Sequence, residues 1–150
     1  MQTIGDLLES AQKIDINYLI SESLVDSSQE YVRLQREQML KGLTATGRPI
    51  MSSLRREGSP PPEEYSYSYR KYKGKAFPID LYDKGNFQEN IFLHTDNAQT
   101  FTVDSADSKS GKLQEVFGTS IFGLNDQSKS EFIPIAAQNL VSDLKNELSK

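Results

Sequence analysis

The sequence predicts a fold of the α+β class, with N-terminal helices, a small antiparallel β-sheet, a C-terminal helix and a long extended loop. Apolar residues recur at helical spacing near both ends of the chain, which predicts amphipathic helices there. Near the middle, Phe101 and Val103 alternate with threonines, as in a half-buried strand. We expect a single domain over residues 1–150, composed of a helical part (1–42), an extended arm (43–62) and an α+β body with a C-terminal helix (63–150).

Capping patterns predict the starts of two N-terminal helices. Thr3 precedes an acidic residue by three positions, and Ser27 precedes Glu30 by three, so that each serine or threonine hydroxyl would accept a backbone N–H. The helix that Ser27 opens is expected to end at Lys41, with Gly42 in a left-handed conformation. A helix between these two carries apolar residues at helical spacing: Ile16, Leu19, Ile20 and Leu24. The polar residues of the Ser27 helix are interpreted as a solvated or subunit-contacting face: Arg33, Gln35, Arg36, Glu37 and Gln38.

Residues 43–85 are rich in turn signals. Residues 58–62 read Gly-Ser-Pro-Pro-Pro, an extended stretch, and a long loop of this kind is usually functional or disordered. We expect Pro62 and the two glutamates after it to start a short helix that ends at Gly74. Residues 78–85 are predicted to form a tight turn or a helical turn. One face of the short helix would carry three tyrosines: Tyr65, Tyr69 and Tyr72.

Two strands are predicted over residues 88–94 and 99–104, joined by a turn at the Asp-Asn pair of residues 96 and 97. Asn86 and Glu89 could instead cap a helix, and this alternative to the first strand stays open.

Two more helices are expected in the C-terminal third. Residues 110–117 predict a short helix that Gly118 stops, and an apolar loop follows. Pro134 suits the first position of a final helix over residues 135–148, because proline lacks the N–H that a first helical residue does not need.

Composition excludes several classes of function. The chain has 150 residues with no Cys and one His, so disulfide scaffolds, Cys-based zinc sites, thiol nucleophiles and His-rich metal sites are excluded. The lack of Cys also suits a reducing compartment. No apolar run approaches the ~18 residues of a membrane span, and the first residues lack the basic stretch of a signal peptide. We expect no membrane span, no metal and no cofactor.

Two groups of polar residues could suggest chemistry. His94, Asp96 and Ser105 are residue types of hydrolase triads, but no nucleophile-elbow motif accompanies them, and His94 is interpreted as a surface strand residue. Asp104 and Asp107 lack the glycine and terminal glutamate of a calcium loop and are interpreted as part of a polar turn. The sequence therefore predicts a protein that is not an enzyme.

Charge is segregated along the chain. Residues 48–75 hold seven basic and three acidic groups, a net charge of +4, whereas the remainder holds ten basic and eighteen acidic groups, a net charge of −8. Tyrosines interleaved with basic residues are typical of protein interfaces and of nucleic-acid binding, and a solvated face is the third interpretation. We favour protein–protein contact, in which this segment docks on the acidic body of the next copy and the contacts close into a ring. The candidate interface residues are Arg55, Arg56, Tyr65, Tyr67, Tyr69, Arg70, Lys71, Tyr72 and Lys73.

A series of short motifs runs through residues 42–124. A helix that ends at Gly42 is followed by Thr-Gly-Arg-Pro, then by the spaced tyrosines and Lys71 or Lys73. Residues 78–87 read Pro-Ile-Asp-Leu-Tyr-Asp-Lys-Gly-Asn-Phe, and an apolar, glycine-containing loop comes later. This order resembles the small virion-morphogenesis, neck and tail-completion proteins of tailed bacteriophages, in particular those of crAss-like phages. Lys84 stands where that family usually has Thr.

The resemblance implies a structural subunit, repeated around the axis of a phage neck or tail, that joins the portal to the tail without catalysis. The implied partners are copies of itself in a ring and other phage neck, portal or tail proteins. The implied localisation is the virion, after synthesis in the cytoplasm of the bacterial host. Within the motif, Leu81 would hold the turn in the core, Gly85 would allow a left-handed bend, and Phe87 would enter the core as the strand begins. The alternative function is that of a nucleic-acid-binding accessory protein that uses residues 48–75.

Overall fold

The computed structural model describes residues 3–97 and 100–150, and its helices and two-stranded antiparallel sheet confirm the predicted α+β class. The helices in this part of the chain are α1 (Ile4–Lys13), α2 (Ile16–Asp26), α3 (Ser28–Leu40), α4 (Tyr67–Lys73), α5 (Asn86–Glu89), α6 (Ser110–Phe117) and α7 (Asp126–Leu148). The strands are β1 (Ile91–Thr95) and β2 (Phe101–Ser105), and a 3₁₀ turn covers Thr119–Ile121.

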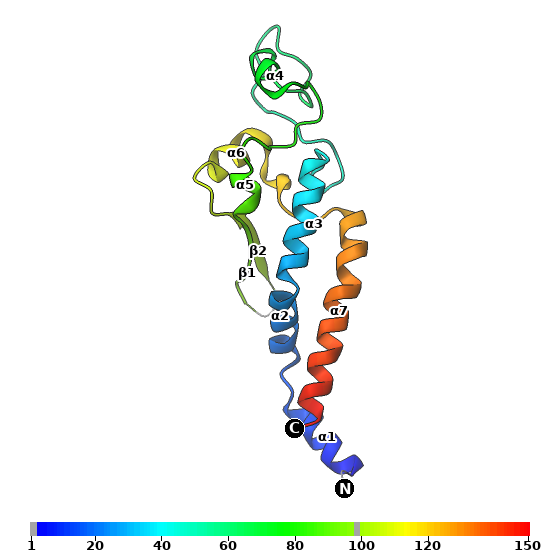
Figure 1. Cartoon of the computed structure of the whole chain (residues 1–150). Coiled ribbons are helices and arrows are strands. Elements are labelled where there is room, and N and C mark those ends of the chain that lie inside the picture. Colours follow the sequence, from blue (N-terminus) through cyan, green and yellow to red (C-terminus); the bar gives the residue numbers. More distant parts are fainter. Residues whose placement is uncertain (1–2, 98–99) are drawn as a thin grey trace.

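The molecule is elongated, and its two ends are built from different elements (Figure 1). α2, α3 and α7 run along its length, and α1 lies at the same end as the C-terminus. The opposite end consists of the loop after α3 together with α4. We refer to residues 48–85 as the lobe, and to residues 3–26 together with residues 133–150 as the helical end.

One of the two predicted capping boxes forms. The Thr3 hydroxyl accepts the Asp6 N–H at 3.1 Å, and the Asp6 carboxylate accepts the Thr3 N–H at 2.7 Å, which confirms the first box. The second prediction is wrong. Although Ser27 precedes α3, its hydroxyl donates to the Ser23 carbonyl at 2.7 Å and accepts from the Asn139 amide at 2.8 Å. Ser27 therefore connects α2 to α7 instead of capping α3.

The first strand is shorter than predicted. Residues 86–89 form α5, so this segment is helical, but Asn86 is the first helical residue and its side chain does not cap the helix. β1 begins only at Ile91. The register of the hairpin runs from Ile91 opposite Ser105 to Thr95 opposite Phe101. The predicted start of the second strand at Gln99 lies outside the described residues, and β2 extends one residue beyond the predicted end.

The final helix starts nine residues earlier than predicted. α7 begins at Asp126, because the Asn125 side chain caps it by accepting the Ser128 N–H at 2.9 Å. Pro134 lies inside the helix. The helix continues past this proline because contacts on both sides of it hold α7 against α2 and α3: Phe132 is buried in the core, and the Ala136 carbonyl accepts the Ser23 hydroxyl at 2.7 Å. The shorter helix α6 and its stop at Gly118 are as predicted.

Part of the predicted polar face of α3 is buried. Gln35 donates to the Ile121 carbonyl at 3.0 Å and accepts the Gly123 N–H at 2.7 Å. Gln38 donates to the Gly123 carbonyl at 2.9 Å and accepts the Asn125 N–H at 2.7 Å. The two glutamines thus satisfy the backbone of the loop before α7, and their interpretation as solvated or subunit-contacting residues is wrong. Arg33 and Glu37 remain exposed, as predicted.

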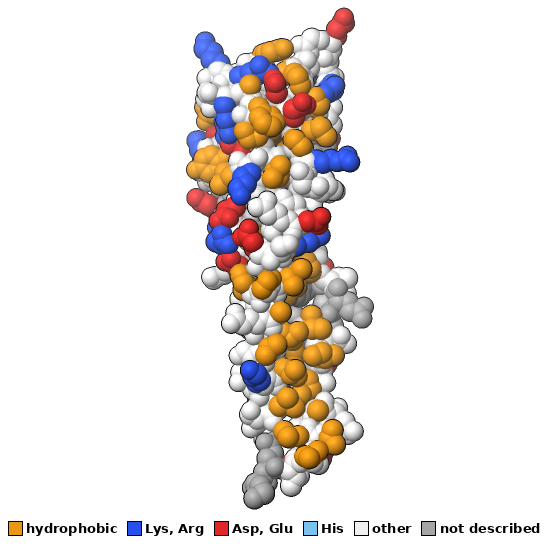
Figure 2. Space-filling model, turned by 90° about the vertical axis from the view of Figure 1, so that its right-hand side faces the viewer, with side chains coloured by type: hydrophobic (Ala, Val, Ile, Leu, Met, Phe, Trp, Pro, Cys, Tyr) orange, Lys and Arg blue, Asp and Glu red, His pale blue; other side chains and the backbone are white. Residues whose placement is uncertain are grey.

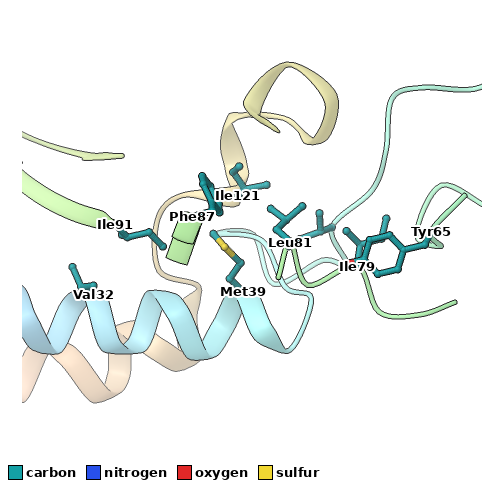
Figure 3. Close-up of a cluster of buried hydrophobic side chains, with 9 residues drawn as sticks. Val32, Met39, Tyr65, Ile79, Leu81, Phe87, Ile91 and Ile121 are labelled. Atoms are coloured by element: carbon teal, nitrogen blue, oxygen red, sulfur yellow. The ribbon is translucent and has the colours of Figure 1, made fainter. Parts of the chain in front are cut away.

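Buried apolar side chains form two clusters along α3. The larger cluster joins α3 to the lobe, to α5 and to β1 (Figure 3), and it consists of Val32, Met39, Ile50, Tyr65, Ile79, Leu81, Phe87, Ile91 and Ile121. The smaller cluster joins α3 to α7 and consists of Tyr31, Leu34, Leu124 and Phe132. α1 contributes no residue to either cluster, and none of its residues is buried.

Candidate functional site

Asp80, which no sequence pattern singled out, lies at the centre of the lobe and is only 6% exposed. Its Oδ1 accepts the Tyr65 hydroxyl at 2.7 Å and the Tyr82 N–H at 3.0 Å. Two ammonium groups complete its surroundings, Lys73 at 2.9 Å from Oδ1 and Lys75 at 2.6 Å from Oδ2. Asp80, which follows α4 in the chain, therefore binds both α4, through Lys73, and the segment before α4, through Tyr65.

Electrostatics favours the charged form of Asp80. Burial acts to raise the pKa of this carboxyl group, but the hydrogen bonds from Lys75, Tyr65, Lys73 and the Tyr82 N–H outweigh burial and lower the pKa to about 2. Burial and the bond to Asp80 raise the pKa of the Tyr65 hydroxyl above its usual value. The carboxylate is therefore ionised and the phenol is neutral at neutral pH, as a structural ion pair requires.

The predicted row of tyrosines exists, but its helix starts later than predicted. Tyr65 and Tyr69 have ring centroids 5.0 Å apart, and Tyr69 and Tyr72 follow at 5.5 Å. The helix begins at Tyr67 with Ser66 as its cap, because residues 62–65 bond to neighbouring segments: the Pro62 carbonyl accepts the Ser52 N–H, and the Tyr65 N–H donates to the Ala76 carbonyl. Gly74 ends the helix, as predicted, and adopts the left-handed conformation.

The nine candidate interface residues fall into two groups. Tyr65, Tyr69, Arg70 and Lys73 make internal contacts; Arg70, for example, pairs with Glu64 and donates to the Tyr65 carbonyl at 2.9 Å. The remaining five are exposed, although Tyr67 contacts Arg70 and Tyr72 bonds Asp83: Arg55, Arg56, Tyr67, Lys71 and Tyr72. Within the described residues, Arg55, Arg56 and Lys71 have no carboxylate partner. The lobe therefore offers a smaller basic surface than the sequence predicted.

The motif at residues 81–87 lies largely where the sequence predicted it. Leu81 is buried and Gly85 has a positive φ of 92°, as predicted. Leu81 itself has a φ of 55°, which is unusual for a residue with a branched side chain. Phe87 is buried as predicted but enters the core from helix α5, so its expected position at the beginning of the strand is wrong.

A pocket of about 470 Å³ lies between the lobe and α6. Its walls are mainly apolar, with Leu54 and residues 60–62 on the lobe side and Leu113, Val116 and Phe117 on the α6 side. Its volume lies in the range of known binding pockets, ~300–1,000 Å³. Sequence reasoning missed this pocket because residues from three separate parts of the chain form it. The proline-rich stretch was its one local signal.

The helical end exposes an unusual number of large apolar side chains. Ile4 is 78% exposed and Leu8 is 60% exposed. Figure 2 shows apolar side chains following one another along this end of the molecule. The exposed apolar residues of the helical end are Ile4, Leu7, Leu8, Ile16, Tyr18, Ile20, Val25, Ile133 and Val141. We refer to this set as the apolar stripe.

The polar residues near the hairpin have structural partners or lie at the surface. The Ser105 hydroxyl donates to the Phe87 carbonyl at 2.7 Å, and His94 is exposed on β1. Asp107 accepts the Lys109 N–H at 2.8 Å in the turn that leads into α6, as interpreted. Asp104 lies in β2 instead of the turn and accepts the Ser110 hydroxyl at 2.6 Å. Across residues 3–97 and 100–150, no group of three or more acidic or histidine side chains is arranged to hold a metal ion.

Comparisons of the chain with models of known families, with curated proteins and with solved structures gave no significant match. None of the helices in the described part of the chain has the length and apolar character needed to cross a bilayer. Function must therefore be inferred from the lobe, the pocket and the apolar stripe.

Proposed function

We propose that this protein is a structural subunit that acts by binding further copies of itself. The observation that supports this most is the apolar stripe, because large apolar side chains that stay exposed together at one end of a molecule mark interaction sites. α1 is the clearest case: its helix is capped and formed, yet none of its residues is buried. Burying the stripe against another subunit would remove this apolar surface from water.

We further propose that these subunits form a ring in the neck or tail of a tailed bacteriophage, where they contact portal and tail proteins. The resemblance of residues 42–124 to neck and tail-completion proteins supports this role, and the role needs no catalytic group. Mass spectrometry of purified phage particles is expected to detect peptides of this chain. Particles that lack the chain would contradict the virion role and leave self-association open.

Replacing Leu8 with Glu is expected to weaken self-association, because the charge would have to be buried at the subunit contact. The matched control is Gln12→Glu, which adds the same charge to the same helix at an exposed polar position. Light scattering after gel filtration gives the mass of each variant. L8E should elute at a lower mass than wild type, whereas Q12E should match wild type. Equal masses for all three proteins would contradict a role for the stripe.

A nucleic-acid-binding role is the second candidate, and the exposed, unpaired Arg55, Arg56 and Lys71 of the described chain favour it. Arg70, Lys73 and Lys75 are already paired with carboxylates, which reduces the charge available for phosphates. This role predicts binding to single- or double-stranded DNA or RNA that weakens steeply as salt is raised. A lack of binding at ~50 mM salt would exclude it.

A further inference from the structure

The pocket between the lobe and α6, which we call the lobe pocket, has the size and lining to bind a group of apolar side chains. Its walls are mainly apolar, with a few charged side chains among them, and Leu54, which lines it, is 70% exposed. The charged lining residues are Glu64, Asp83, Lys84, Asp107 and Lys109. Gln88 also lines the pocket and is 4% exposed. Its Nε2 donates to the Asp80 carbonyl at 3.1 Å, but its Oε1 accepts no hydrogen bond from the described residues.

α1 has the properties of a ligand for such a pocket. Ile4, Leu7, Leu8 and Ala11 follow the spacing by which an amphipathic helix presents one apolar face to a groove. The capping box of Thr3 and Asp6 holds the first turn, so little conformational entropy remains to be lost on binding. α1 packs against α7, yet this contact leaves its apolar face largely exposed.

The lobe as a whole and the helical end carry opposite net charges. The lobe, residues 48–85, holds eight basic and five acidic groups, a net charge of +3. The helical end holds three basic and seven acidic groups, a net charge of −4. Such complementarity brings unlike surfaces together and opposes contact between two helical ends. A smaller apolar groove, of about 350 Å³, lies between α2, α7 and the hairpin, and no basic side chain of the described residues lines it.

We propose that α1 of one copy occupies the lobe pocket of the next copy, an inference that rests on the proposed self-association and specifies its contact. Figure 1 shows α1 and the lobe at opposite ends of the molecule, so the chain cannot fill its own pocket with its own α1. The contact is heterologous, because each copy offers one helix and one pocket. Contacts of this type close into rings when the rotation between copies allows it, and otherwise form filaments.

Two single variants, each removing one half of the contact, test this inference. Leu8→Glu disables α1 and leaves the pocket intact, whereas Leu54→Glu disables the pocket and leaves α1 intact. Both side chains are largely exposed, so both variants are expected to fold, and circular dichroism melting checks this. Each variant alone should associate at least roughly 30-fold more weakly than wild type, the loss typical of a central interface residue.

Mixing the two variants gives the decisive result. A mixture retains one intact contact, between α1 of L54E and the pocket of L8E, so sedimentation velocity should show a one-to-one dimer and nothing larger. Raising the salt concentration should weaken this dimer. If L54E assembles as wild type does, or if the mixture stays monomeric, the α1–pocket contact is wrong while self-association stands. If wild type itself is monomeric at every concentration, the proposed function fails.

Discussion

Replacing Gly42 with Ala is expected to lower the free energy of unfolding by about 3 kcal/mol. Gly42 follows α3 with a φ of 74°, a conformation that costs a residue with a side chain about 1–2 kcal/mol. A Cβ at this position would also lie 2.5 Å from the Pro78 Cβ and 3.0 Å from the Ile79 carbonyl oxygen. Neither atom belongs to a flexible side-chain end, so relieving the overlap would move the segment that carries the buried Ile79 out of the core.

Gly74→Ala is the matched control for this prediction. Gly74 has nearly the same φ, 75°, but a Cβ there would meet no other part of the described chain within 4 Å. The Gly74→Ala variant therefore has the conformational cost of a positive φ without the steric overlap. We expect it to lower the free energy of unfolding by only about 1 kcal/mol. Urea unfolding measures both variants. Equal losses would show that the contact of α3 with the Pro78 segment contributes nothing to stability.

Replacing Asp80 with Asn is expected to destabilise the protein by about 3 kcal/mol, since removing one member of a buried ion pair leaves the other without compensation. Lys73 would be the charge left behind, with a side chain only 11% exposed. The melting temperature should fall by roughly 6–12 °C. Asp83→Asn is the control, because Asp83 bonds the Tyr72 hydroxyl at the surface, and it should change the free energy of unfolding by less than about 0.5 kcal/mol.

The same carboxylate predicts how stability depends on pH. The pKa of Asp80 is about 2 in the folded protein and 3.8 for an ordinary aspartate, so the unfolded chain takes up a proton first as the pH falls. The contribution of Asp80, about 2 kcal/mol, is complete above about pH 5 and is lost as the pH falls toward 2. The free energy of unfolding of D80N should therefore fall less than that of wild type as the pH is lowered from about 5 to 2. If the stability of D80N declines with falling pH as steeply as that of wild type, Asp80 is not the source of this pH dependence.

Elements that depend on local signals could be predicted from the sequence. The capping box of Thr3 and the helix ends at Gly42, Gly74 and Gly118 each need only a few neighbouring residues, and all four are where the sequence placed them. The motif residue Gly85 belongs with them, because its positive φ is a property of one turn.

Elements that depend on distant partners could not be predicted. Ser27 looks like a cap in the sequence, but its hydrogen bond to Asn139 spans 112 positions. Gln35 looks like a surface residue, but it bonds Ile121, which is 86 positions away. In the candidate site, too, local features could be predicted and features that depend on distant residues could not. The basic and tyrosine-rich composition identified the lobe, whereas the role of Asp80 required its contacts with Tyr65 and two lysines, and the pocket required the position of α6.

The central claim is that a chain with so much exposed apolar surface functions as one part of an assembly. Its polar composition and its helix α1, none of whose residues is buried, are features that a second copy would complement. The proposed α1–pocket contact would make the assembly head-to-tail, because each copy would bind one neighbour by its helix and another by its lobe.

Sedimentation equilibrium of the wild-type protein, from low micromolar to millimolar concentration, tests this claim most directly. We expect the average mass to rise with concentration above that of the 16.9 kDa chain and to level off at a whole multiple of it if the contacts close into a ring. A mass of one chain at every concentration would contradict the account.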